Sequence, residues 1–125
     1  MGDRVQVCFP ETGVWLYSHW DGDMIIEDVR RALAKKWRWD DPEYLARIVL
    51  DEMTGGRMDE TGYGIGTKQH GDVDRVVEID TEKGLVRLMV GESEASMEWA
   101  PIYKGTFVAF IDSDIDSFGY TEEDE

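Results

Sequence analysis

The order of strand-like and helix-like segments constrains the fold of this chain more than any other feature. Residues 5–9 and 14–17 are apolar runs on either side of a Pro-Glu-Thr-Gly turn, which is typical of a β-hairpin. Residues 75–80 and 85–90 repeat this arrangement with many β-branched side chains. Two segments with helical periodicity lie between the hairpins. The sequence therefore predicts an α+β fold: an N-terminal β-hairpin, two helices and then antiparallel strands, with the helices packed on one face of the sheet.

The first helix is expected over residues 24–36. Apolar side chains recur there every four positions, at Ile25, Val29 and Leu33. Asp21 or Asp23 is expected to cap the N-terminus of this helix. Basic residues gather toward its C-terminus, where they complement the helix dipole.

The second helix is expected to begin at a proline and to end at a pair of glycines. Asp41 is the expected N-cap, with Pro42 at the first helical position. A capping box formed by Asp40 and Glu43 is the alternative. Apolar side chains keep the helical period through residue 53, and Gly55-Gly56 is expected to terminate the helix.

The remaining segments are expected to extend the sheet and then to leave it. A short edge strand is expected within residues 63–67, an extended edge segment over 99–103, and a last apolar strand over 106–111. Residues 112–125 carry seven acids and no base. The expected organisation is one α+β domain over residues 1–111, followed by an acidic C-terminal tail over 112–125.

Length and cysteine content point to a single reduced domain. A chain of 125 residues suits one domain with a sizeable core. Cys8 is the only cysteine, which excludes an intramolecular disulfide, and its place in a predicted strand indicates a small buried residue. No stretch approaches the roughly 18–20 apolar residues of a membrane span, and no signal-peptide pattern precedes the first strand. We therefore expect a soluble cytoplasmic protein that does not bind membranes.

The charge is strongly negative and unevenly distributed. The chain has 28 Asp+Glu against 13 Lys+Arg, a net charge of -15. Residues 92–125 hold ten acids and one base, which gives -9, and residues 1–91 hold the remaining 18 acids and 12 bases, which gives -6. Such a chain repels nucleic acid and acidic membranes and is attracted to basic protein surfaces. Adaptation to high salt, or solubility alone, is the competing explanation.

Three segments carry a resemblance. They are Val14-Trp15-Leu16-Tyr17-Ser18-His19-Trp20-Asp21-Gly22, Trp39-Asp40-Asp41-Pro42-Glu43-Tyr44-Leu45-Ala46-Arg47-Ile48, and Glu60-Thr61-Gly62-Tyr63-Gly64-Ile65-Gly66. In this order they resemble a group of small uncharacterised proteins encoded by phages, prophages and some bacterial genomes, over roughly residues 12 to 90. The resemblance implies a mobile-element setting and no particular activity. The acidic segment after residue 91 lies outside it.

No catalytic motif is strong enough to name a reaction, so we expect a protein without enzymatic activity and without a cofactor. The alternative is a small metal-dependent hydrolase centred on His19 and Asp21, because an imidazole two residues from a carboxylate can orient water or hold a metal. A site of His19, Asp21, His70 and Asp72 requires the Gly-rich loop over 54–74 to fold back. The competing interpretation is structural, with His19 at a strand end and Asp21 in a turn. No zinc site is expected, because such a site needs three or four ligands and no second His or Cys lies at ligand spacing.

A cluster of basic and aromatic residues over 30–39 resembles those that bind nucleic-acid backbones, although the net charge opposes this. The alternative is a solvated helix face that docks the acidic tail within the same chain. In the tail, Asp112, Asp114 and Asp116 with Glu123 partly imitate a calcium loop. Ser117 stands where such a loop needs glycine, so solvated acids are favoured over weak divalent-cation binding.

The leading hypothesis is an acidic, phage- or prophage-borne inhibitor. Spaced carboxylates can imitate the phosphates of a duplex, and two aromatic side chains among them can supply apolar contacts. The expected partner is a basic nucleic-acid-binding protein of the host, blocked as anti-restriction or anti-CRISPR proteins block theirs; the sequence leaves a homodimer open. The expected partner-binding residues are Asp112, Asp114, Asp116, Phe118, Tyr120, Glu122 and Glu123.

Overall fold

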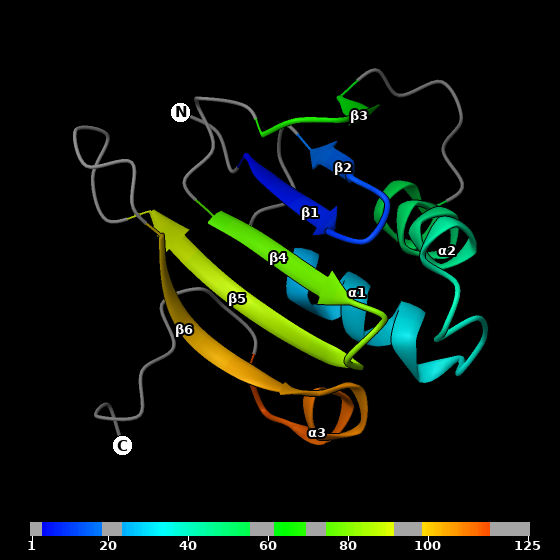
Figure 1. Cartoon of the computed structure of the whole chain (residues 1–125), viewed down its shortest axis with the longest axis vertical. Helices are drawn as coiled ribbons and strands as arrows, with labels where there is room; N and C mark the ends of the chain where they lie inside the picture. Colours follow the sequence, from blue (N-terminus) through cyan, green and yellow to red (C-terminus); the bar gives the residue numbers. More distant parts are fainter. Residues whose placement is uncertain (1–3, 19–23, 56–61, 70–74, 92–98, 116–125) are drawn as a thin grey trace.

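The computed structural model describes residues 4–18, 24–55, 62–69, 75–91 and 99–115. Six strands form one sheet in the order β3-β2-β1-β4-β5-β6 (Figure 1). Their bounds are β1 Val5–Phe9, β2 Val14–Ser18, β3 Tyr63–Gly66, β4 Arg75–Asp80, β5 Leu85–Gly91 and β6 Trp99–Thr106. The central pair β1 and β4 is parallel, and every other neighbouring pair is antiparallel. The α+β fold and both hairpins are confirmed, and β3 and β6 are the edge strands.

Three helices lie against this sheet: α1 Ile25–Ala34, α2 Pro42–Thr54 and α3 Phe107–Asp112. Their buried side chains share one core with Val5, Val7 and Phe9 of β1. Because side chains alternate along a strand, Cys8 points to the opposite face, where it packs with Val76. The prediction of a buried cysteine is confirmed. Burial and the nearby Glu78 carboxylate raise the pKa of the Cys8 thiol to about 12.

The first helix is shorter than the sequence indicates. It begins after Met24, which makes no side-chain cap, and it ends at Ala34. The predicted caps Asp21 and Asp23 lie outside the described residues. The early end has a backbone cause: Lys36 has a positive φ of 60°, and its N–H donates to the carbonyl oxygen of Leu33 over 2.9 Å. The chain therefore turns out of the helix before residue 36.

The second helix matches the prediction at both ends. The Asp41 side chain accepts a hydrogen bond from the Tyr44 N–H over 3.5 Å, and Pro42 is the first helical residue. At the other end Gly55 adopts φ 62° and donates its N–H to the Asp51 carbonyl oxygen. Left-handed backbone of this kind is the conformation that glycine favours after a helix.

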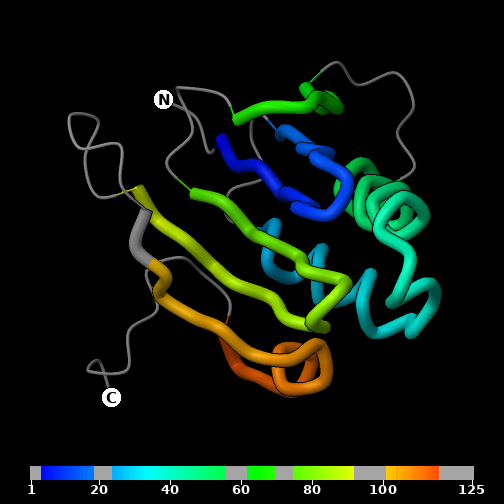
Figure 2. Tube along the Cα trace, viewed as in Figure 1, coloured from blue at the N-terminus to red at the C-terminus, as the bar shows by residue number. Residues whose placement is uncertain are grey.

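The predicted strand over residues 106–111 is wrong. β6 runs on to Thr106, and residues 107–112 then form the short helix α3, whose path is followed in Figure 2. The Thr106 hydroxyl accepts from the Ala109 N–H over 3.1 Å and so caps the helix. Phe107 and Phe110 are buried three positions apart, whereas Val108 is 53% exposed. A helical turn satisfies this spacing, and a strand would have placed the two phenylalanines on opposite faces.

Within the described ranges, no helix has the length and apolar character needed to cross a bilayer.

Candidate partner-binding site

The predicted acidic site begins where α3 ends, and aromatic packing fixes the position of this helix. The Phe107 ring meets the indole of Trp39 edge to face, with ring centroids 5.2 Å apart. The Phe110 ring lies 6.0 Å from that of Tyr103 on β6. Aromatic pairs at such distances stabilise a core beyond the area that they bury. These two contacts hold α3 between the loop that follows α1 and the edge strand β6.

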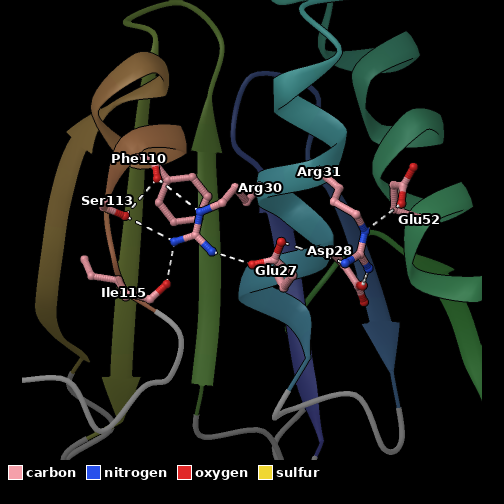
Figure 3. Close-up of polar contacts among 8 residues, drawn as sticks. All are labelled: Glu27, Asp28, Arg30, Arg31, Glu52, Phe110, Ser113 and Ile115. Carbon is pink, nitrogen blue, oxygen red and sulfur yellow. Dashed lines mark hydrogen bonds and ion pairs between the residues drawn. The ribbon is translucent and has the colours of Figure 1, made fainter.

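Arg30 of α1 holds the chain that leaves α3 (Figure 3). Its guanidinium donates to the carbonyl oxygen of Ile115 over 2.5 Å, to the Ser113 hydroxyl over 3.2 Å and to the carbonyl oxygen of Phe110 over 3.4 Å. On its other side it pairs with Glu27 over 2.7 Å. We call Glu27, Arg30, Phe110, Ser113 and Ile115 the Arg30 cluster. The planar five-donor guanidinium suits this role because it serves several acceptors at once.

The Arg30 cluster extends the folded part of the chain beyond residue 111. Ile115 is only 3% exposed and belongs to the core, and the guanidinium carbon of Arg30 stands 5.1 Å from the centroid of the Phe110 ring. The Ser113 hydroxyl also donates to the Phe110 carbonyl oxygen over 2.8 Å. The first residues after α3 thus have a fixed path.

This path leaves the first two predicted site acids on the surface. Asp112 is the last residue of α3 and Asp114 follows one position after the C-cap; both are exposed. They alternate with Ser113 and Ile115, which face inward. The other predicted partner-binding residues lie outside the described residues; these are Asp116, Phe118, Tyr120, Glu122 and Glu123.

The alternative site lies outside the described residues altogether, since His19, Asp21, His70 and Asp72 all fall in segments that the structure does not describe. Among the residues that are described, no group of three His, Cys, Asp or Glu side chains is placed to hold a metal ion. The calcium-like pattern is described only in part, because it needs Asp116 and Glu123 as well.

The basic residues of α1 serve the fold. Arg31 pairs with Asp28 over 2.5 Å and with Glu52 of α2 over 3.2 Å, and Lys35 pairs with Glu52 over 3.0 Å. The hydrogen bond from Lys35, together with Arg31, holds the pKa of Glu52 below its ordinary value. These pairs join α1 to α2. Arg31 and Lys35 of the predicted basic cluster are thus engaged in ion pairs within the fold.

A further group of acids gathers at the turns that follow β1 and β4. The two strands are parallel neighbours, so their turns lie side by side, and the Thr81 hydroxyl donates to the Glu11 carboxylate. Partial desolvation and the carboxylates of Glu82 and Asp80 raise the pKa of Glu11. Sequence reasoning missed this group because the two turns are 70 residues apart and only the parallel pairing joins them.

Sequence reasoning also missed the role of Arg30. Its acceptors near the end of α3 lie 80 to 85 residues away, and two of them are backbone carbonyl oxygens, which leave no trace in a residue pattern. Comparison with known proteins adds no relative to this geometry: no protein-family model, no curated protein and no solved structure matches the chain.

Proposed function

We propose that this chain is an acidic, non-enzymatic binding protein of phage or prophage origin. It docks its C-terminal acids on a basic nucleic-acid-binding protein of the host and blocks it, as an anti-restriction or anti-CRISPR inhibitor does. The observation that carries the proposal is the Arg30 cluster, which fixes the start of a segment with seven acids and no base.

Physical reasons support a fixed start for such a segment. A negative surface steers a basic partner and raises the association rate. A ligand whose first residues are already ordered loses less conformational entropy on binding. Asp112 and Asp114 meet both conditions, because they are exposed and lie on either side of Ser113, which Arg30 holds.

The test is capture of partners from a bacterial lysate by the full-length protein and by a charge-reversed variant. The variant replaces Asp112, Asp114 and Asp116 by lysine, and we expect it to lose the captured protein, which should itself be basic and bind nucleic acid. The retained protein should also lose its nucleic acid when the wild-type chain is added.

A matched control keeps the same change in net charge at another place. Asp40, Glu43 and Glu82 are exposed acids outside the C-terminal segment, and their replacement by lysine should leave capture intact. Equal loss in both variants would mean that net charge alone drives the binding. Unchanged capture by the first variant would refute the assignment of the site.

A further inference from the structure

The loop between α1 and α2, residues 35–41, is held in a costly conformation. Lys36 has φ 60° and Arg38 has φ 59°, and these are the two described residues other than glycine with positive φ. Left-handed backbone costs a residue with a side chain roughly 1–2 kcal/mol. Glycine would meet the same geometry without this cost, yet the chain carries a cation at both positions. Strain kept in this way points to a use for the side chains.

The two cations stand on either side of an exposed aromatic residue. Trp37 is 60% exposed, and the ammonium nitrogen of Lys35 lies 5.5 Å from its ring centroid. The guanidinium carbon of Arg38 lies 4.2 Å from the ring centroid of Tyr44, which is 50% exposed. We call Lys35, Lys36, Trp37, Arg38 and Tyr44 the loop surface. Trp, Tyr and Arg are the residues that most often dominate binding energy at interfaces.

The charges of the loop surface are only partly satisfied. Lys35 is paired with Glu52, and Arg38 has a long contact of 3.9 Å with Asp41. No ion pair joins Lys36 to any acid among the described residues. The surface thus suits a ligand that carries both carboxylates and aromatic rings. A separate anionic molecule would have to approach a protein of net charge -15, whereas a segment of the same chain is already present.

The C-terminal segment has the right composition and starts close by. Ten residues follow Ile115, and they include five acids, no base and the aromatic residues Phe118 and Tyr120. Ile115 is bonded to Arg30, from which α1 rises about 1.5 Å per residue toward the loop. The loop also touches α3 directly, through Trp39 and Phe107. Ten residues can span up to about 33–36 Å, several times the distance along the helix.

We propose that the loop surface binds the acidic C-terminal segment of its own chain. The aromatic side chains of the segment pack on Trp37 and Tyr44, and its carboxylates lie beside Lys36 and Arg38. A tethered ligand has an effective concentration of about millimolar, which favours this contact over the same contact between two molecules. This contact would also regulate partner binding, because a basic partner must displace the loop surface to reach the acids. That part of the inference rests on the proposed function.

The test follows the indole N–H resonances of the full-length protein by proton–nitrogen correlation NMR. One variant replaces Phe118 and Tyr120 by serine and the five acids of residues 116–125 by their amides. The Trp37 resonance, assigned with Trp37→Phe, is expected to shift by more than its linewidth. The Trp39 resonance is the internal control and should stay in place, because its indole N–H donates to the Leu33 carbonyl oxygen over 3.0 Å. An unshifted Trp37 resonance would overturn the inference.

A second pair of variants tests the loop side of the contact. High salt weakens the contact between the carboxylates and the cations, so it gives the Tyr120 resonances of the released segment. The double variant Lys36→Gln, Arg38→Gln should shift the Tyr120 resonances toward those positions. The control is the double variant Lys83→Gln, Lys104→Gln, which removes two exposed cations elsewhere and should leave the Tyr120 resonances in place. The difference in the Trp37 resonance between the wild-type protein and the variant of residues 116–125 should not depend on protein concentration. A difference that disappears on dilution would mean that the contact joins two copies of the chain, and it would overturn the proposal.

These measurements need no partner, so they fail independently of the proposed function. A docked segment with no captured protein would support the contact and count against the inhibitor. A captured protein together with an unshifted Trp37 resonance would support the inhibitor and count against the contact within the chain.

Discussion

Replacing Arg30 by methionine removes the side chain that fixes the exit of α3. Methionine keeps much of the apolar stem but donates no hydrogen bond to Phe110, Ser113 or Ile115. A hydrogen bond from a charged group contributes about 1.5–3 kcal/mol, and the contact with the Phe110 ring adds about 0.5–1 kcal/mol. The contributions of these bonds are not additive, and the bond to the Phe110 carbonyl oxygen is long at 3.4 Å. The Arg30 side chain is 15% exposed, so water can form some of the hydrogen bonds that the variant loses. We therefore expect unfolding free energy to fall by about 3 kcal/mol.

The assay is urea unfolding followed by circular dichroism, with the slope of the transition fitted for each protein. Arg30→Lys, which keeps the charge and one donor direction, should recover about half of the loss. The matched control is Arg47→Met, since Arg47 is 65% exposed in its pair with Asp51 and should cost less than about 0.5 kcal/mol. A cost for Arg30→Met as small as that of the control would refute the reasoning.

Three further predictions concern single side chains. Glu52→Gln should cost about 1 kcal/mol near neutral pH, because Glu52 of α2 pairs with Arg31 of α1 and with Lys35 just after that helix. The folded-state pKa of Glu52 is lowered, so this contribution is complete above the ordinary pKa of 4.5 and is lost as the pH falls through the lowered pKa; unfolding measured against pH checks this. Gly105→Ala should cost about 1–2 kcal/mol in urea unfolding, since an added Cβ would meet the Tyr103 hydroxyl oxygen at 2.3 Å. Cys8, with a thiol pKa of about 12, should react with a thiol reagent only after unfolding.

Each of these has an outcome that would count against it. A Glu52→Gln cost that persists at acid pH would show that packing, not charge, is lost. Gly66→Ala is the control for Gly105→Ala, because nothing lies within 4 Å of its added Cβ, and equal costs would mean that the contact with Tyr103 is irrelevant. Fast labelling of Cys8 in the folded protein would show that the face opposite the helices is open.

The sequence predicts most of the fold because local signals agree with the tertiary arrangement. Asp41, Pro42 and Gly55 mark the ends of α2, and each does in the structure what its chemistry suggests. The failure at 106–111 has a definite cause. The run is apolar at nearly every position, so its sequence fits the period of a strand as well as that of a helix. The cap from Thr106 and the burial of both Phe107 and Phe110 favour the helix.

The candidate site is less accessible to sequence reasoning. A pattern of acids predicts a charged segment but not what holds its first residues. Arg30 does this through the hydroxyl of Ser113 and the backbone carbonyl oxygens of Phe110 and Ile115. Every residue type has a backbone carbonyl, so the sequence does not mark these two as acceptors. The positive φ of Lys36 was hidden for a similar reason, because lysine gives no hint of left-handed backbone.

The parallel pairing of β1 with β4 has a consequence for how the chain folds. Each hairpin closes over a short turn, whereas Gln6 and Val76, which face each other across the central pair, are 70 positions apart. Closing such a long loop loses more chain entropy than closing a short turn, and this loss comes before the contacts that compensate for it can form. We therefore expect the two hairpins to form early and their union at the middle of the sheet to be the slow event in folding. The helices α1 and α2 lie in the intervening chain, and we expect their packing against β1 to bring the two halves together.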